Sequence, residues 1–264
     1  MIAPAPAKIN LALVVGPVRA DGKHELMTIY QRIDLVDRVR VEPADKTTVT
    51  GFPDTIVTRA LELLPGAWHV RIEKRIPVAA GLGGGSSNAA TALRLANAQL
   101  DAPLPGEELQ ALAARVGADV PFFLVDGPQL GAGDGTHLRG LDLPQDFAVL
   151  ILLPKGAAKR STADVYAAFD ARDGATGFEV RADTLRAMVE RVRRPRDLAE
   201  LPPNDLAESP LVERLLAAGA FRADVSGAGP ALYGLFHSTA AAEAAERAVR
   251  GLGRTWITVP AWYG

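Results

Sequence analysis

The sequence predicts an α+β protein in two parts, and two observations carry this prediction. The half that follows Pro144 is expected to run strand, helices, strand, strand, helix, strand, an order typical of a split βαβ or ferredoxin-like domain. The first half combines alternating strands with a glycine-rich loop that leads into an alanine-rich helix. At 264 residues the chain is long enough for two ordinary domains, which we expect at 1–145 and 146–264.

An alternating segment near the N-terminus predicts a strand at residues 7–15. Apolar side chains fall on one face of this segment, while Lys8, Asn10 and Ala12 fall on the other. The strand therefore carries a lysine and an asparagine next to each other on its polar face. Further strands are expected at 38–42, 47–50 and 68–73, and helices at 54–64, from the glycine-rich loop to about Leu100, and at 107–116.

The second half begins with an apolar run, 147–153, which predicts a buried strand. Two later strands, at 224–226 and 231–236, flank a turn of small residues, Ser226-Gly227-Ala228-Gly229-Pro230. The remaining elements complete the order given above: helices at 163–170, 183–193, 206–218 and 239–252, and a last strand at 255–259.

Composition limits the classes of protein to which this chain can belong. With 48% apolar and 23% charged residues, it has the composition of a globular protein. A net charge of −2 gives no electrostatic footprint for nucleic acid, and no apolar run is long enough to span a membrane. The absence of cysteine and the four scattered histidines argue against a zinc site. The N-terminus lacks the pattern of a signal peptide, so we expect a cytoplasmic protein with neither nucleic acid nor membrane as a partner.

The glycine-rich loop is the strongest chemical signal in the sequence. Four glycines in five positions allow positive φ, expected at Gly84 among others, and a close approach of the backbone to a ligand. Because the loop leads into a helix, unpaired N–H groups and the positive end of the helix dipole converge on one point, which predicts a nucleotide phosphate site. The residues expected to bind this cofactor are Pro77, Ala79, Ala80, Gly81, Leu82, Gly83, Gly84, Gly85, Ser86 and Ser87.

Two better-known phosphate loops fit this segment less well. No lysine follows the glycines until Lys155, so the Walker A pattern is absent. Residues 81–86 partly imitate the dinucleotide fingerprint, but the charged run 73–75 precedes them where that fold needs a buried strand. A flexible turn with capping serines is the remaining alternative, and glycine linkers seldom lead straight into an alanine-rich helix.

Three motifs in one order extend this reading over nearly the whole chain. They are Ala5-Pro6-Ala7-Lys8-Ile9-Asn10-Leu11, the glycine-rich loop, and the turn at 226–230. Together they resemble the galactokinase, homoserine kinase, mevalonate kinase and phosphomevalonate kinase (GHMP) superfamily. The resemblance implies a ribosomal-S5-like α/β domain followed by a ferredoxin-like domain, with ATP and Mg²⁺ as cofactors and a small-molecule alcohol as the acceptor.

Further segments, 19–26, 117–123 and Asn204-Asp205-Leu206, resemble one branch of that superfamily. The branch phosphorylates the 2-hydroxyl of the cytidine diphosphate derivative of methylerythritol, in the non-mevalonate route to isoprenoid precursors. We expect a monomer or weak homodimer. Two alternatives remain open: another GHMP kinase of the homoserine or mevalonate type, and a non-catalytic nucleotide- or RNA-binding module.

Asp119 and Lys8 are the candidate catalytic residues. From spacing alone, Asp119 before Val-Pro favours a helix N-cap, and a lysine on a strand's polar face favours a solvent-exposed side chain. The resemblance implies instead that Asp119 is the catalytic base and that Lys8 lies beside it, where an ammonium favours the carboxylate. Asn10 would then orient either the substrate hydroxyl or the lysine.

His24 and Tyr166 are the residues that the resemblance assigns to the cytidine end of the substrate. Lys23 departs from the family, which carries a stacking tyrosine there, and Ala79 departs from the usual glycine. Asp134, in a Gly-rich segment, is expected to form a turn. For Mg²⁺ the sequence leaves Ser86, Ser87 and Asn88 open, and no metal ligand is assigned.

Overall fold

The computed structural model describes residues 1–157 and 161–261. Two antiparallel strands, β1 and β2, are the longest strands of a six-stranded sheet in the first half of the chain. The C-terminal part of β2 also pairs with β4, and its N-terminal part pairs with β5. The strands are β1 (Ile2–Val18), β2 (His24–Pro43), β3 (Thr48–Thr50), β4 (Trp68–Glu73), β5 (Gln129–Gly133) and β6 (His137–Gly140).

A four-stranded antiparallel sheet forms the second half, in the order β10-β7-β9-β8. The first strand thus lies between the last and the third, which is the ferredoxin-like arrangement predicted from the element order. The α+β fold class is confirmed. The strands are β7 (Ala148–Pro154), β8 (Arg222–Val225), β9 (Leu232–Phe236) and β10 (Gly253–Thr258).

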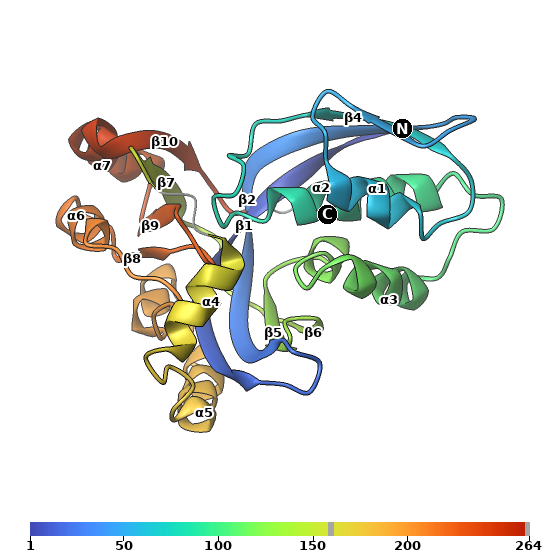
Figure 1. Ribbon diagram of the computed structural model, residues 1–264. Coiled ribbons are helices and arrows are strands. Elements are labelled where there is room, and N and C mark those ends of the chain that lie inside the picture. The colour runs from blue at the N-terminus through green and yellow to red at the C-terminus, as the bar shows by residue number, and fades with distance from the viewer. Residues whose placement is uncertain (158–160, 262–264) are drawn as a thin grey trace.

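Seven α-helices and three short 3₁₀ helices are described in residues 1–157 and 161–261. In Figure 1, α1, α2 and α3 gather with the blue and green strands, and α6 and α7 lie with the red and orange ones, while α5 lies beside the blue strand β1. The helices are α1 (Thr55–Leu61), α2 (Gly84–Asn97), α3 (Gly106–Val116), η1 (Pro121–Leu124), α4 (Thr162–Asp170), α5 (Phe178–Val189), η2 (Pro195–Glu200), α6 (Leu211–Ala217), α7 (Thr239–Val249) and η3 (Arg250–Leu252).

One hydrophobic cluster joins the two sheets. Ile9 and Leu11 of β1 belong to the same cluster as Val149 and Ile151 of β7 and Leu185 of α5. A second cluster packs α1, α2 and α3 on the first sheet. Because β1 contributes apolar side chains to both parts of the molecule, most of its residues are fully buried. The domain limits 1–145 and 146–264 remain a prediction.

Several predicted elements were wrong in extent. The strand expected at 38–42 is the end of the much longer β2, and the hairpin of β5 and β6 was not predicted. The helices expected at 183–193 and 206–218 are displaced, since α5 begins earlier and α6 begins later. Residues ahead of α6 instead form an extended segment that bridges to β1 at Leu13 and Asn204. No helix within the described ranges is long and apolar enough to cross a membrane.

Candidate active site

The glycine-rich loop ends in a helix N-terminus with free donors. Gly81 and Gly83 have positive φ, 82° and 69°, and Gly83 is the N-cap of α2. The N–H groups of Gly84, Gly85 and Ser86 lie in the first turn, which offers them no carbonyl of its own helix. The Ser87 N–H, by contrast, donates to the Gly83 carbonyl at 2.9 Å. The loop therefore presents three backbone donors at the positive end of the helix dipole.

The structure corrects one expectation for this loop and shows the consequence of the departure at Ala79. Gly84 is the first helical residue of α2 and is not among the residues at positive φ, so the prediction for its backbone was wrong. Ala79 has φ of 53°, a left-handed conformation that favours glycine, so the departure at this position carries backbone strain. The physical reason in both cases is the turn of the chain into α2, which Ala79, Gly81 and Gly83 make before the helix begins.

Two cavities meet at this loop. The larger, of about 820 Å³, is lined by the candidate catalytic and substrate residues, including Lys8, Asp119, His24 and Tyr166. The smaller, of about 490 Å³, lies between the loop and the segment 52–56 at the start of α1. Five residues line both cavities: Ala79, Gly81, Gly83, Ser86 and Thr162. A molecule in each cavity would therefore meet the other at the first turn of α2.

The three hydroxyl and amide residues near the start of α2 occupy different environments. Ser86 lines both cavities. Ser87 and Asn88 are fully buried and line neither, and the Ser87 hydroxyl and the Asn88 carboxamide have no hydrogen-bond partner in the structure. No group of three or more histidine, aspartate or glutamate side chains that could hold a metal is found in the described part of the chain.

Lys8 and Asp119 come together across 111 positions of sequence. The Lys8 ammonium lies 3.5 Å from Asp119 Oδ2, with the lysine side chain 5% exposed and the aspartate 32% exposed. The expectation of a solvent-facing lysine is thus wrong, because β1 is buried on both faces. Asp119 does not cap a helix either: the N-cap of η1 is Val120, without a side-chain bond. The pair therefore places a buried ammonium beside a partly exposed carboxylate.

Asn10 fixes the position of that lysine. Its carboxamide oxygen accepts a hydrogen bond from Lys8 Nζ at 2.7 Å, and its Nδ2 donates to Thr28 Oγ1 at 2.7 Å. The Thr28 hydroxyl in turn donates to the Ala12 carbonyl at 2.7 Å. All three side chains are buried. Two roles were left open for Asn10, and these hydrogen bonds correspond to the one in which Asn10 orients the lysine.

Tyr30 is a site residue that the sequence analysis missed. Its hydroxyl donates to Asp119 Oδ1 at 3.1 Å, and its ring stacks on Phe122 with centroids 4.8 Å apart. Burial, together with the Asp119 carboxylate, raises the pKa of Tyr30 well above its ordinary value, so this phenol stays a donor. Its place on a strand was hidden because β2 was recognised only at its far end.

His24 and Tyr166 lie together in the larger cavity. Their rings stack with centroids 4.6 Å apart and planes inclined by 30°. His24 Nε2 lies 2.8 Å from Asp170 Oδ1 of α4, and burial followed by the Asp119 charge raises the pKa of Tyr166 to about 12. Two rings at this spacing leave no room for a third between them, since two stacking contacts need about 7 Å. A flat ligand would stack on the far face of Tyr166 or displace His24.

Lys23 forms an ion pair with Asp134 at the edge of the same cavity. The Lys23 ammonium donates to Asp134 Oδ2 at 2.5 Å, with the lysine side chain 52% exposed. Asp134 Oδ1 accepts from the backbone and hydroxyl of Thr136, so it forms the turn expected from the sequence. Burial opposes ionisation, but the Lys23 and Thr136 hydrogen bonds lower the pKa of Asp134 to about 2. The lysine is thus held by a carboxylate at the place assigned to a stacking ring.

Two family models match this chain. The model for the N-terminal domain of GHMP kinases matches residues 55–127, and the model for their C-terminal domain matches residues 209–255. A crystal structure of mevalonate kinase superposes with a TM-score of 0.75 over 98% of this chain and 99% of that one, at 14% identity. At that identity the likeness concerns the fold alone.

Relatives with higher identity cover almost the whole chain. The 4-diphosphocytidyl-2-C-methyl-D-erythritol kinase of Anaeromyxobacter dehalogenans (strain 2CP-1) is 39% identical over 94% of this chain and 84% of that protein. A crystal structure of 4-(cytidine 5'-diphospho)-2C-methyl-D-erythritol kinase is 34% identical, with a TM-score of 0.77 and full coverage of both chains. The chain therefore belongs to the GHMP kinase family, and it is a small-molecule kinase that uses ATP.

Proposed function

We propose that this kinase transfers the γ-phosphoryl group of ATP to the 2-hydroxyl of 4-diphosphocytidyl-2-C-methyl-D-erythritol. The observation that carries the proposal is the position of the Lys8–Asp119 pair, in a cavity that also holds His24 and Tyr166 and opens onto the glycine loop. The names of the relatives, which match along nearly the whole chain, support the choice of substrate.

The nucleotide is assigned to the smaller cavity. Its triphosphate would lie on the first-turn N–H groups of α2, and its base against the segment 52–56. Lys74 also lines this cavity, where Asp37 holds its ammonium, so a positive charge lies close to the loop. This placement brings the γ-phosphoryl group to Ser86, where the two cavities meet.

The residues present fit a magnesium ion bound mainly by phosphate and water. Mg²⁺ prefers oxygen ligands and keeps several waters, and the Ser86 hydroxyl is the one of the three open candidates that lines both cavities. Ser86 would hold the ion, which neutralises charge on the phosphate oxygens when bound. Ser87 and Asn88 are left to the interior of the fold.

Asp119 is assigned as the residue that binds the acceptor hydroxyl and takes its proton. In a loose phosphoryl-transfer transition state, catalysis rests on positioning and on charge stabilisation. Asp119 accepts the hydroxyl proton, the Lys8 ammonium compensates its charge, and the Tyr30 hydroxyl holds the other carboxylate oxygen. Because Asn10 and Thr28 fix the lysine, little reorganisation is needed when the hydroxyl arrives.

The cytidine end is tested by replacing Tyr166. Tyr166→Ala is expected to raise KM for the cytidine substrate about 10- to 100-fold, because loss of one base–aromatic stack costs on the order of 1–3 kcal/mol. Tyr166→Phe keeps the ring and should keep the KM. KM for ATP should hardly change in either variant, since ATP is assigned to the other cavity.

Lys23→Tyr should lower KM for the cytidine substrate by adding a second ring. Steady-state kinetics with each substrate varied in turn measures these effects.

Two outcomes would contradict the assignment of Tyr166 to the cytidine end. An increase confined to KM for ATP in Tyr166→Ala would mean that the two nucleotide ends are assigned the wrong way round. An unchanged KM for both substrates would leave Tyr166 as a packing residue and remove the physical support for a cytidine pocket here.

A further inference from the structure

Asn204 lies in a segment that crosses from the second half of the chain to β1. The Asp205 N–H donates to the Leu13 carbonyl at 2.9 Å, and Asp205 Oδ2 accepts from the Val15 N–H at 2.9 Å. Leu13 and Asn204 form an isolated parallel bridge. The segment thereby joins the strand that carries Lys8 and Asn10, a few residues from both.

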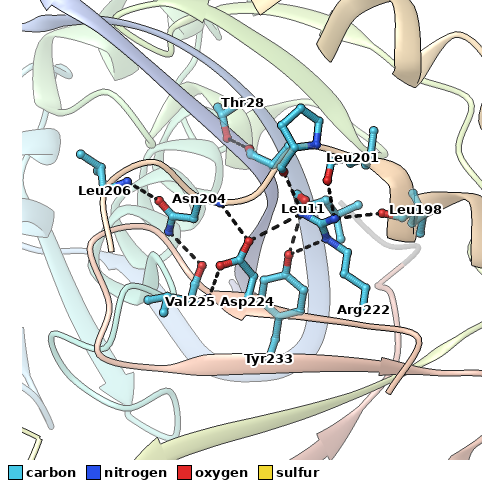
Figure 2. A network of polar contacts seen from close by, with 12 residues as sticks. Leu11, Thr28, Leu198, Leu201, Asn204, Leu206, Arg222, Asp224, Val225 and Tyr233 are labelled. Atoms are coloured by element: carbon cyan, nitrogen blue, oxygen red, sulfur yellow. Dashed lines mark hydrogen bonds and ion pairs between the residues drawn. The ribbon is translucent and has the colours of Figure 1, made fainter. Parts of the chain in front are cut away.

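The Asn204 side chain uses every hydrogen-bonding group it has. Its Nδ2 donates to the carbonyls of Val225, at 2.9 Å, and Gly227, at 2.6 Å, while its Oδ1 accepts from the Leu206 N–H at 2.8 Å. Asn204 is 4% exposed. Figure 2 shows it between Leu206 and Val225, beside Asp224. An amide with both hydrogens used at one turn determines where that turn lies.

A network of buried polar side chains holds the backbone of Asn204 in place. Asp224 Oδ2 accepts from the Asn204 N–H at 2.9 Å and lies 3.7 Å from Arg222 Nη2. Arg222 donates to the carbonyls of Leu198 and Leu201, and to the Tyr233 hydroxyl (Figure 2). The side chains of Asn204, Asp224, Arg222 and Tyr233 are all buried, so the network that holds the Asn204 amide is fixed in position.

The turn that Asn204 holds lies next to the lysine of the catalytic pair. A Cβ built on Gly227, which has φ of 57°, would lie 3.3 Å from Lys8 Nζ and 3.4 Å from Asn10 Oδ1. The same turn is tied to the phosphate loop, since Ser226 Oγ donates to the Gly81 carbonyl at 3.0 Å and the Ala231 N–H to the Ala80 carbonyl at 3.0 Å. Displacement of the turn would therefore leave space beside the lysine.

We propose that Asn204 is a positioning residue of the kinase reaction, which places Lys8 by holding the 226–229 turn against it. The inference rests on the proposed role of the Lys8–Asp119 pair. A shift of about 1 Å in a catalytic group can cost on the order of 100-fold in rate. Loss of the two amide donors should therefore lower kcat while the donors of α2 keep most of the affinity for ATP.

The test is a double-mutant cycle of Asn204→Asp and Gly227→Ala, with kcat, KM for ATP and thermal unfolding measured for each protein. The aspartate keeps the size of the side chain and removes both donors. We expect kcat to fall about 10- to 100-fold in each single variant. The double variant should lie close to the poorer single variant, because both changes act on one turn. KM for ATP should stay within about threefold.

Asn97→Asp is the matched control. Asn97, the last residue of α2, is also buried and forms the same kind of amide contacts, donating to the Leu104 carbonyl at 3.0 Å and accepting from its N–H at 2.8 Å. This variant should lower the melting temperature and leave kcat within about twofold of wild type. If Asn204→Asp unfolds below the assay temperature, Asn204→Ser, which keeps a hydroxyl donor, replaces it in the cycle.

Two outcomes would overturn the positioning role. The first is a wild-type kcat in folded Asn204 variants, and the second is a double variant whose loss is the product of the two single losses. The cycle is measured on whichever alcohol the wild type phosphorylates. A wild-type enzyme that ignores the cytidine substrate therefore contradicts the proposed function without deciding the role of Asn204.

Discussion

Asp119→Asn and Lys8→Met are each expected to lower kcat about 10²–10⁴-fold, the range typical of removing general acid–base assistance. Asparagine keeps the shape of the carboxylate but cannot take the hydroxyl proton. Methionine keeps the buried stem of the lysine and removes the ammonium that lies 3.5 Å from Asp119. ATP affinity should change little, because the phosphate donors belong to α2. Steady-state kinetics, with ATP binding by calorimetry, measures both quantities.

The exposed aspartate Asp142, in the segment that connects β6 to β7, provides the control. Asp142→Asn makes the same chemical change away from both cavities and should keep the wild-type kcat. Near wild-type turnover in both Asp119→Asn and Lys8→Met would contradict the assignment of this pair. Asp119 would then be a residue that only holds Lys8 and the Tyr30 hydroxyl.

Gly83→Val is expected to weaken ATP binding on the order of 100-fold or more. Gly83 is the N-cap of α2 and has φ of 69°. A β-branched residue resists this left-handed conformation, and the strain costs about 1–3 kcal/mol. A Cβ there would also lie 2.9 Å from Lys8 Cγ and 3.0 Å from Phe123 Cζ. The first turn would have to move, and its N–H groups would no longer converge on the phosphates. Titration calorimetry measures the affinity, with circular dichroism as the check on folding.

Gly106→Val is the matched substitution for this experiment. Gly106 is the first residue of α3, and a Cβ there would have no atom within 4 Å, so ATP affinity should not change. A folded Gly83→Val protein with the wild-type affinity for ATP would show that the triphosphate binds elsewhere than on this helix N-terminus.

The parts of the fold that the sequence predicted are those with strong local signals. The order of elements after Pro144 gave the ferredoxin-like sheet, and the glycine cluster gave the helix that begins there. The first two-thirds of β2 went unrecognised because its residues are buried on both faces, so apolar and polar positions no longer alternate. Among the glycines, sequence could not separate Gly83 at positive φ from helical Gly84, since the bend depends on where α2 packs.

The candidate site shows the same limit. Lys8, Asp119, His24 and Tyr166 were found through motifs, and the structure brings all four into one cavity. The contacts that orient them join residues far apart, 89 positions for Tyr30 and Asp119 and 146 for His24 and Asp170. Such pairs have no local pattern, because the packing of β2 against η1 and α4 creates them. The roles of the individual residues stay predictions until the variants are measured.

ADP release in the presence of a panel of alcohols tests the central claim most directly. The panel contains 4-diphosphocytidyl-2-C-methyl-D-erythritol, homoserine, mevalonate and a sample without acceptor, each with ATP and Mg²⁺. Because a site that hydrogen-bonds its substrate rejects molecules lacking those groups, we expect kcat/KM for the cytidine substrate to exceed the others on the order of 100-fold or more. Fastest turnover with homoserine or mevalonate, or ADP release at one rate with and without an acceptor, would contradict the proposed function.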